Sequence, residues 1–196
     1  MFNNVHNINY SSVYTVSDVV NQLNKKKIIA YPTESVFSLG CDPDSKSAIF
    51  SLIKLKNRNI NKGFILIAAH YDQLKPYILE KKILLSHKKI LSSYWPGHKT
   101  FLLPANDNVP YWLNGNSSFI ATRITNHKVV KNLCSLFGKP IISTSANLTG
   151  LLPCRTVEEF YKQFGKNIML LRGPLGINKK PSSIFNLITG EIVRYG

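Results

Sequence analysis

The sequence predicts an α/β fold in which helices flank one open, twisted, mixed sheet. Short runs rich in Ile, Val and Leu alternate with amphipathic helical patterns along most of the chain, an order typical of α/β proteins. The last two apolar runs are joined by the turn-forming pair Thr189-Gly190, which predicts a closing hairpin. The chain shows no internal repeat, linker or second core, so we expect a single domain over residues 1–196.

The N-terminal part is predicted to form two helices and two strands, with an apolar run between them. We expect a helix that begins near 16 and ends in 25–27, a helix over about 45–57, strands over 28–31 and 63–69, and an apolar run over 36–41. Pro32 is expected to end the first strand, so Thr33, Glu34 and Ser35 follow a strand end. Ligand contacts in α/β sheets often lie at such positions.

A basic segment leads from the second helix into the second strand and contains Lys54, Lys56, Arg58 and Lys62. Lys56 continues the apolar stripe of its helix, because it lies seven, four and three residues after three apolar positions. An unpaired charge that points inward is costly, so this position predicts an anion near the helix end. The alternatives are a lysine that reaches past the last turn to water, or a helix that stops early.

The C-terminal part is predicted to form three helices and six strands. We expect helices over 83–94, 129–137 and 156–165, and strands over 100–103, 119–125, 141–145, 168–171, 184–188 and 192–195. The longest loop, 104–117, either covers a site or is variable surface. Residues 173–181 form a second, Gly/Pro/Lys-rich loop.

Two of these strands carry polar residues that suit a ligand. Arg123 lies in mid-strand and needs a partner; we favour an anionic ligand over an ion pair, because the chain has only ten carboxylate residues. Ser143, Ser145 and Asn147 alternate in PIISTSANLTG, which would place hydroxyls and an amide on one side. The alternative is a simple turn that leaves the strand.

The composition adds a strong positive charge. Lys and Arg number 25 against 10 Asp and Glu, giving a formal net charge of +15, which favours nucleotides or nucleic acid as partners. Lysine, Asn and Ile are abundant, however, and drift toward AT-rich codons would give the same bias. The charge alone therefore does not decide between binding and drift.

Other features bear on the compartment. No apolar run approaches the roughly 20 residues of a membrane span, and the first residues lack the pattern of a signal peptide, so we expect a cytoplasmic protein without membrane contact. Cys41, Cys134 and Cys154 are odd in number and widely spaced. They predict free thiols and argue against disulfides and a zinc site.

Several catalytic motifs are absent from the sequence. It contains no Gly-rich phosphate loop, no dinucleotide turn, no Gly-x-Ser-x-Gly elbow and no metal spacing among its five histidines. The remaining inventory fits positioning and charge neutralisation instead of covalent catalysis. Its cations are Lys56, Arg58, Lys62, Arg123 and Arg194, and its neutral groups are Thr33, Ser143, Ser145, Asn147 and Ser182.

Taken together, several segments resemble the YrdC/TsaC-type L-threonylcarbamoyladenylate synthases, most closely the short bacterial form. They are IAYPTESVFSLGCDPDS, LKNRNINKGFILIA, WPGHKTFLLPA, ATRITNHKVV, PIISTSANLTG and PSSIFNLITGEIVRYG, in that order, and they span residues 28–196. The resemblance implies an open α/β fold with a positively charged concave face. It also implies that ATP, L-threonine and bicarbonate are converted to threonylcarbamoyl-AMP and pyrophosphate, with Mg²⁺ held mainly through the ATP phosphates.

The resemblance further implies partners and residue roles. The product would serve adenosine 37 of tRNAs that read codons beginning with A, through separate threonylcarbamoyl-transfer proteins, with at most a weak tRNA contact by this chain. Lys56 and Arg58 match the catalytic, phosphate-binding Lys-x-Arg pair. The other ATP-binding matches are Lys62, Ser145, Asn147, Ser182 and Arg194, and the threonine and bicarbonate matches are Thr33, Arg123, Ser143 and Ser145.

The chain departs from the family pattern at two places. Ser38 stands where many relatives have Gly, and His98-Lys99 replaces a more usual Pro-containing sequence. Two other readings of the chain stay open: a non-catalytic RNA-binding module that uses the basic face, and an adenylate hydrolase on the same scaffold.

Overall fold

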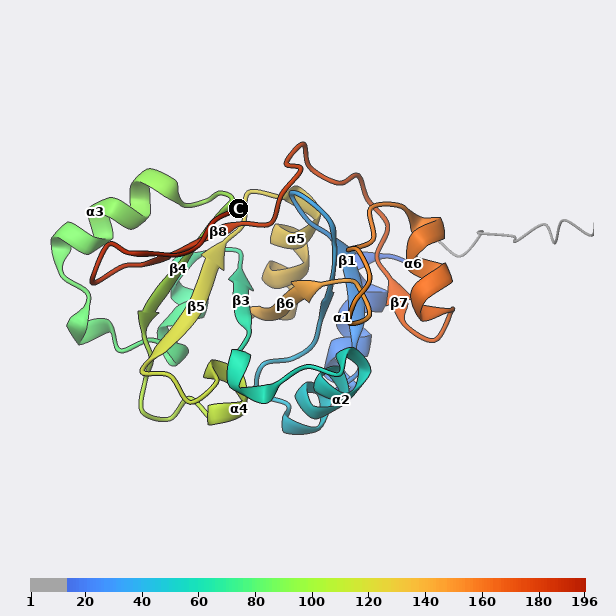
Figure 1. Ribbon diagram of the computed structural model, residues 1–196, viewed down its shortest axis with the longest axis horizontal. Helices are drawn as coiled ribbons and strands as arrows, with labels where there is room; N and C mark the ends of the chain where they lie inside the picture. The colour runs from blue at the N-terminus through green and yellow to red at the C-terminus, as the bar shows by residue number, and fades with distance from the viewer. Residues whose placement is uncertain (1–13) are drawn as a thin grey trace, which may run out of the picture.

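The computed structural model describes residues 14–196, and their strands form one nine-stranded sheet in the order β7-β1-β2-β6-β3-β5-β4-β8-β9 (Figure 1). The strands are β1 Ile29–Pro32, β2 Phe37–Gly40, β3 Ile65–Ala68, β4 Lys99–Pro104, β5 Phe119–Ile124, β6 Ile141–Ser145, β7 Met169–Leu170, β8 Ser183–Asn186 and β9 Ile192–Arg194. The α-helices are α1 Val16–Asn24, α2 Lys46–Lys56, α3 Leu85–Tyr94, α4 Tyr111–Asn114, α5 Lys128–Phe137 and α6 Val157–Phe164. Three 3₁₀ helices are Ile60–Lys62, Tyr71–Tyr77 and Glu80–Lys82.

The sheet is mixed, as predicted. The pairs β1/β7, β3/β5 and β4/β8 are parallel, and the other neighbours are antiparallel. The closing hairpin of β8 and β9 is confirmed. The expected α/β fold with an open sheet and flanking helices is therefore correct.

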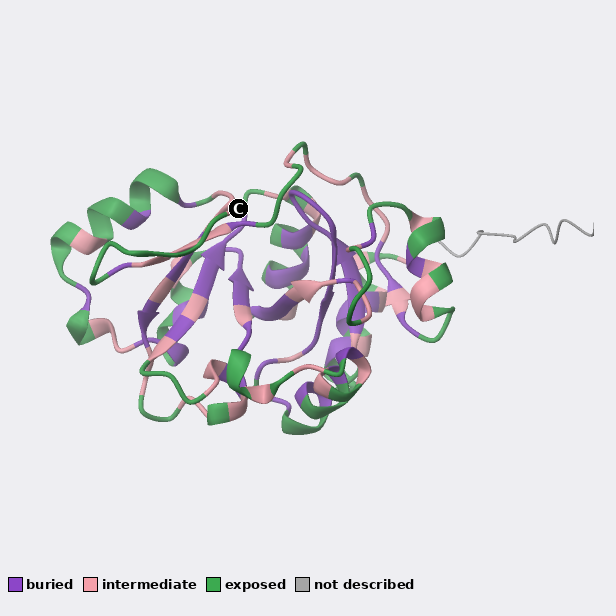
Figure 2. Cartoon of the chain, viewed as in Figure 1, coloured by how far each residue is buried: buried purple, intermediate pink, exposed green. Residues whose placement is uncertain are grey.

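Both faces of the sheet are covered by apolar side chains. Successive strand residues alternate between two buried clusters: Leu66 and Ile142 belong to the larger cluster, whereas Ile67 and Ile141 belong to the smaller one with α1 and α5. This alternation follows from the two-residue period of a strand. The central strands are buried, whereas much of α3 and of the closing hairpin is exposed (Figure 2).

Most predicted boundaries lie within one or two residues of the observed ones, with two local differences. Pro32 does not end the ladder, because it pairs with Phe37 in a tight β1/β2 hairpin. The long loop contains the one-turn helix α4, which has too few residues to show helical periodicity. The expectation about a signal peptide concerns residues that lie outside the described part of the chain.

Two further expectations can be compared with the structure. Cys41, Cys134 and Cys154 are free and buried, as predicted, and burial raises the pKa of each thiol. Within residues 14–196, no helix is both long and apolar enough to cross a membrane.

Candidate functional site

The end of helix α2 meets the end of strand β6 through Lys56. The side chain is buried, with 6% of the residue exposed. Its Nζ donates to the carbonyl oxygens of Ser145 and Asn147, both at 2.7 Å, and to Asn147 Oδ1 at 3.2 Å. Ser145 Oγ also donates to Asn147 Oδ1 at 2.6 Å. Lys56 therefore points inward, as its place in the apolar stripe predicts.

The surroundings of Lys56 decide between the alternatives that the sequence left open. The helix reaches Lys56, and the ammonium does not extend to water, so an early stop and an outward-reaching side chain are both wrong. Its three acceptors are neutral oxygens of the chain. Burial and the neighbouring Arg58 charge lower its pKa to about 8. The predicted contact of Lys56 with an anion stays a prediction.

Arg58 lies just beyond the helix and points in a different direction. Asn57 ends α2 in the left-handed conformation, with φ of 43°, and turns the chain before Arg58. Arg58 Nη2 donates to the carbonyl oxygen of Gly63 at 2.7 Å, and its guanidinium lies 4.9 Å from the centre of the Phe64 ring. Its Nε is buried without a hydrogen-bond acceptor. Arg58 is thus held in place with donor capacity to spare.

The C-terminal hairpin brings Arg194 to this region. Arg194 Nη2 donates to the carbonyl oxygen of Ser182 at 2.7 Å, and the Ser182 hydroxyl lies 2.8 Å from that of Thr100 on β4. Burial lowers the pKa of Arg58, and the Arg194 charge lowers it further. Burial likewise lowers the pKa of Arg194, with a second contribution from Arg123. The charge of Arg123 therefore affects the pKa of Arg194, and the charge of Arg194 affects the pKa of Arg58.

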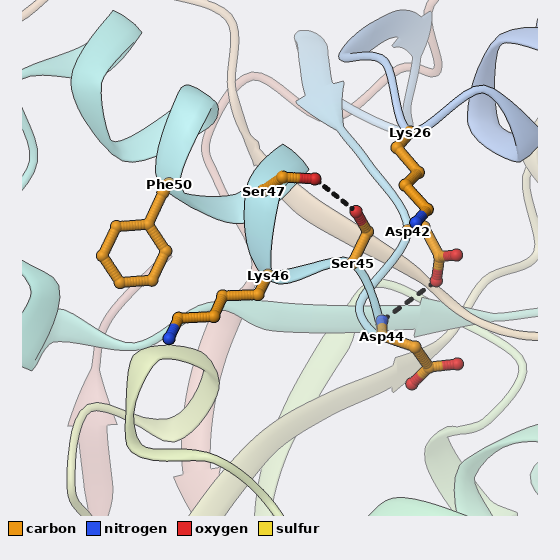
Figure 3. Close-up of a pocket in the computed structure, with 7 residues that line it drawn as sticks. All are labelled: Lys26, Asp42, Asp44, Ser45, Lys46, Ser47 and Phe50. Carbon is orange, nitrogen blue, oxygen red and sulfur yellow. Dashed lines mark hydrogen bonds between the residues drawn. The ribbon is translucent and has the colours of Figure 1, made fainter.

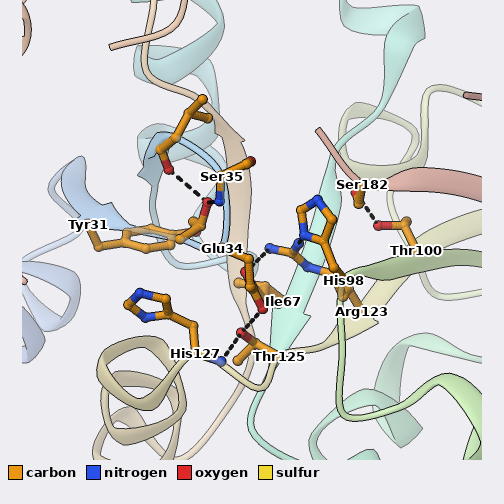
Figure 4. Close-up of polar contacts among 12 residues, drawn as sticks. Tyr31, Glu34, Ser35, Ile67, His98, Thr100, Arg123, Thr125, His127 and Ser182 are labelled. Atoms are coloured by element: carbon orange, nitrogen blue, oxygen red, sulfur yellow. Dashed lines mark hydrogen bonds and ion pairs between the residues drawn. The ribbon is translucent and has the colours of Figure 1, made fainter. Parts of the chain in front are cut away.

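Arg123 has a carboxylate partner, which the sequence analysis ranked second. Arg123 Nη2 lies 3.2 Å from Glu34 Oε2, and the pair is buried (Figure 4). The Thr125 hydroxyl donates to Glu34 Oε1 at 2.6 Å. Our preference for a ligand in place of an ion pair is thus wrong for the contact seen in this structure. The Nε of Arg123 is buried without an acceptor, and a threonine-binding role stays a prediction.

Three other predicted residues lie around these groups. The Thr33 hydroxyl donates to the carbonyl oxygen of Val36 at 2.7 Å and so shapes the β1/β2 turn. Ser143 is buried on β6 and interacts with the Tyr31 hydroxyl. Burial raises the pKa of Tyr31, and the Ser143 contact and the Arg123 charge oppose this shift. Lys62 is exposed on the 3₁₀ turn after Arg58. Only its backbone carbonyl, 3.5 Å from Arg58 Nη2, ties it to the predicted site by a hydrogen bond within the described residues.

Two cavities lie away from these residues. One, of about 630 Å³, is at the N-terminal end of α2 and is lined by Lys26, Asp42, Asp44, Ser45, Lys46, Ser47 and Phe50 (Figure 3). The other, of about 460 Å³, includes Tyr77, Trp112 and Lys139. Lys56 and Arg58 are at the opposite end of α2, roughly 16 Å away for eleven residues of helix. Asp42 and Asp44 also make the first cavity a poor place for a triphosphate, so we locate the candidate site by its convergent cations.

The described residues do not supply a protein metal site. Within residues 14–196, no cluster of three or more His, Cys, Asp or Glu side chains could hold a metal ion. The candidate site is instead rich in cations and neutral hydrogen-bonding groups, which suit an anion.

Two residues of the site were missed as contributors. Glu34 was noted only for its place after a strand, and its pairing with Arg123 joins residues far apart in sequence. His98 was noted only as a departure from the family pattern. Its Nδ1 lies 3.1 Å from Arg123 Nη1, and its Nε2 lies 3.0 Å from the carbonyl oxygen of Lys180. The need of Arg123 for a partner was the one signal that pointed toward Glu34.

Comparisons with known proteins identify the family to which this fold belongs. The Sua5/YciO/YrdC family, described as "Telomere recombination", matches residues 21–196. A threonylcarbamoyl-AMP synthase of Buchnera aphidicola subsp. Baizongia pistaciae is 53% identical over 185 residues, which cover 94% of this chain and 100% of that protein. A threonylcarbamoyl-AMP synthase of Escherichia coli O1:K1 / APEC is 46% identical over 181 residues, which cover 92% and 95%.

Solved structures show the same fold. E. coli YciO has a TM-score of 0.79 and 25% identity, covering 92% of this chain and 88% of that one. P. abyssi Sua5 in complex with L-threonine has a TM-score of 0.81 and 24% identity, and covers 88% of this chain. This chain spans about half of that Sua5 chain, 51%. The chain therefore belongs to the Sua5/YciO/YrdC family.

Proposed function

We propose that this chain is a threonylcarbamoyl-AMP synthase, which makes L-threonylcarbamoyladenylate and pyrophosphate from L-threonine, bicarbonate and ATP. Relatives that bear this name are 46–53% identical and are matched over 92–94% of this chain. The structural observation that carries the proposal is the meeting of α2 and β6, where Lys56 binds the Ser145–Asn147 segment directly. This contact supports the proposal because it joins the end of α2, from which Arg58 follows, to the Ser145–Asn147 segment.

The proposed reaction has two steps. The amine of threonine and bicarbonate form an N–C bond, water leaves, and N-carboxythreonine results. A carboxylate oxygen of this carbamate then attacks the α-phosphorus of ATP, and the bond from that phosphorus to the bridging oxygen of pyrophosphate breaks. Because such carbamates are unstable in water, we expect the pocket to shield them.

The residues of the chain would act mainly by alignment and charge neutralisation. Arg58 and Arg194 would bind the phosphates as charge develops on the leaving pyrophosphate, with Lys62 on the turn after Arg58 and Ser182 hydrogen-bonded to Arg194. Lys56 would serve the same end by fixing Ser145 and Asn147. Arg123 would bind the threonine carboxylate, with Thr33 and Ser143 around the amino acid. Because residues 14–196 form no cluster of three or more His, Cys, Asp or Glu side chains that could hold a metal ion, Mg²⁺ would be held mainly through the ATP phosphates.

The proposal extends to the cellular role. The product would pass to separate transfer proteins that modify adenosine 37 of tRNA, in the cytoplasm, where those tRNAs are used. The whole chain, residues 1–196, would act as one domain.

Mass spectrometry of a reaction that contains ATP, threonine and ¹³C-labelled bicarbonate tests the proposed function. A labelled threonylcarbamoyl-AMP adduct with an equal amount of pyrophosphate supports it. AMP with free threonine and no adduct would instead indicate an adenylate hydrolase. No ATP consumption, together with salt-sensitive RNA binding, would indicate the RNA-binding module.

A further inference from the structure

Residues 174–180, which we call the strap, lie against the turn between β1 and β2. The amide of Gly176 donates to the carbonyl oxygen of Thr33 at 2.9 Å, and the amide of Asn178 donates to that of Glu34 at 3.0 Å. The strap belongs to the segment between β7 and β8, which crosses one end of the sheet (Figure 1). It therefore covers the turn that holds the carboxylate partner of Arg123.

A histidine contacts each end of the strap. His127 Nε2 lies 2.9 Å from the carbonyl oxygen of Pro174, and His98 Nε2 lies 3.0 Å from that of Lys180. Because a carbonyl oxygen only accepts, each histidine must carry a hydrogen on Nε2 to make its bond. Each end of the strap is thus held by one Nε2–H group, that of His127 at Pro174 and that of His98 at Lys180.

The two histidines are joined through the buried network (Figure 4). His98 Nδ1 lies 3.1 Å from Arg123 Nη1, and Arg123 in turn pairs with Glu34. Glu34 accepts from the Thr125 hydroxyl, and Thr125 Oγ1 accepts from the backbone amide of His127 at 3.0 Å. A continuous chain of polar contacts therefore runs from one end of the strap to the other through Arg123.

We propose that His98 is a positioning residue that holds both the Arg123 guanidinium and the strap in place, and does so only in its neutral form. A guanidinium has donors and no acceptor, so His98 Nδ1 must be the acceptor of that bond. With the hydrogen on Nε2 already required by Lys180, the ring is the neutral Nε2-H tautomer. A second proton on Nδ1 would remove the acceptor for Arg123 and place two cations together. The Nε2–H donor would remain, so the strap would be released by the repulsion from Arg123, which displaces the ring and with it the Lys180 contact.

The charges around His98 set the direction of its pH response. Arg123 faces it from β5, Glu34 faces it from the β1/β2 turn, and Arg194 on β9 acts on Arg123. Burial lowers the pKa of His98, and the Arg123 charge lowers it as well. The Lys180 and Pro181 backbone contacts and the Glu34 charge raise it, and the net shift is a lowering. The neutral form is therefore favoured at neutral pH. Protonation, and release of the strap, are expected as the pH falls below the ordinary histidine value of about 6.5.

Hydrogen exchange of the strap amides tests this inference. The exchange rates of Gly176 and Asn178, each divided by the intrinsic rate at that pH, are compared at pH 7.5 and 5.5 for wild type, His98→Gln, His98→Ala and the control His87→Gln. His87 accepts from the Leu84 amide at the start of α3, outside this network. We expect a several-fold loss of protection at acid pH in wild type and His87→Gln. His98→Gln, which keeps a donor and an acceptor but cannot titrate, should show no acid loss.

His98→Ala should expose the strap at both pH values, and it should raise KM for threonine more than kcat falls. Equal protection in wild type and His98→Gln at both pH values would overturn the inference. Because the role in threonine binding rests on the proposed function, the exchange experiment is read without turnover. Absence of the adduct would refute the function and leave the strap result standing, whereas a normal adduct with a pH-independent strap would refute only the role of His98.

Discussion

Lys56 and Arg58 are only two residues apart, yet they contact different parts of the structure. Lys56 turns inward and binds the end of β6, and its three acceptors are all oxygens of the chain. Arg58 follows the left-handed Asn57, has its pKa lowered by burial and by the Arg194 charge, and retains a buried Nε without an acceptor. We infer that Lys56 organises the site, whereas Arg58 has the free donor capacity that an anion needs.

This division predicts that loss of Lys56 mainly harms stability. In Lys56→Met, the buried oxygens of Ser145 and Asn147 would lose their shared donor. We expect the free energy of unfolding to fall by about 1–3 kcal/mol, measured by urea denaturation. Lys54→Met, at an exposed position of the same helix, is the matched control and should unfold near the wild-type midpoint. Equal midpoints for both variants would show that the Lys56 contacts contribute nothing.

The buried ion pair of Glu34 and Arg123 predicts a pH-dependent loss of stability. Glu34→Gln leaves Arg123 buried without its counter-charge, which typically costs about 3–5 kcal/mol. Burial raises the pKa of Glu34, but Arg123 and the Thr125 hydroxyl outweigh it and lower the pKa overall. Ionised Glu34 therefore stabilises the fold at pH values above the ordinary pKa of a glutamate. This contribution is lost as the pH falls below that ordinary value and through the lowered pKa of Glu34 in the fold.

The measurement is urea unfolding of wild type and Glu34→Gln at pH 7 and at pH 4. The gap between the two proteins should be large at pH 7 and smaller at pH 4. Glu158→Gln, at an exposed carboxylate of α6, should stay close to wild type at both values. A gap that does not change with pH would mean that the charge of Glu34 is not what stabilises the fold.

At the scale of elements, the long loop 104–117 supports the turn that carries Arg58. The Phe64 amide donates to the carbonyl oxygen of Leu113 at 2.9 Å, which ties the loop to the start of β3. Gly115 has φ of 72°, and a Cβ there would lie 2.4 Å from the carbonyl oxygen of Asn61 and 2.7 Å from the nitrogen of Gly63. Gly63 is also the residue whose carbonyl oxygen holds Arg58. The loop thus supports the backbone of Gly63, which in turn holds Arg58.

Gly115→Ala should therefore reduce both stability and activity. The added methyl must displace the backbone that anchors Arg58, in addition to the strain of a positive φ, which costs about 1 kcal/mol. Gly138→Ala is the control: its φ is 82°, and a Cβ there meets nothing within 4 Å. We expect both variants to lose some thermal stability, and only Gly115→Ala to lose pyrophosphate release beyond the loss of folded protein. Equal activity of the two folded variants would show that the loop does not support the site.

Elements with local signals were predictable from sequence. Helix α2 is capped by Ser45, whose hydroxyl accepts from the Ala48 amide, and helix α6 is preceded by Thr156, which forms a capping box with Glu159. Strand β6 has the predicted bounds because an apolar β-branched run follows Pro140. Helix α4 was missed, since one turn shows no periodicity.

The candidate site was predictable in its cations and less so in its contacts. The inward direction of Lys56 follows from helical phase, and this part was correct. The partner of Arg123 did not follow, because no local pattern shows which strand turn will lie beside a mid-strand arginine. The same limit applies to His98 and the strap, whose contacts depend on the packing of distant segments.

At the scale of the whole molecule, the sheet order gathers one site from distant parts of the chain. The β1/β2 turn, the end of α2, β5, the end of β6 and the C-terminal hairpin supply Arg58, Arg123 and Arg194, against the single carboxylate of Glu34. This local excess of positive charge does not depend on the total of +15, most of which is lysine. The account therefore depends on the arginines and not on the net charge.

The most direct measurement is threonine- and bicarbonate-dependent pyrophosphate release by wild type, Arg58→Ala and the charge-matched control Lys131→Ala, whose lysine is exposed on α5. A charge-assisted contact of roughly 1.5–3 kcal/mol predicts a loss of about tenfold to a few hundredfold for Arg58→Ala, with its circular dichroism unchanged. Lys131→Ala should retain wild-type turnover. Near-normal release by folded Arg58→Ala would contradict the claim that Arg58, just beyond the end of α2, binds the triphosphate.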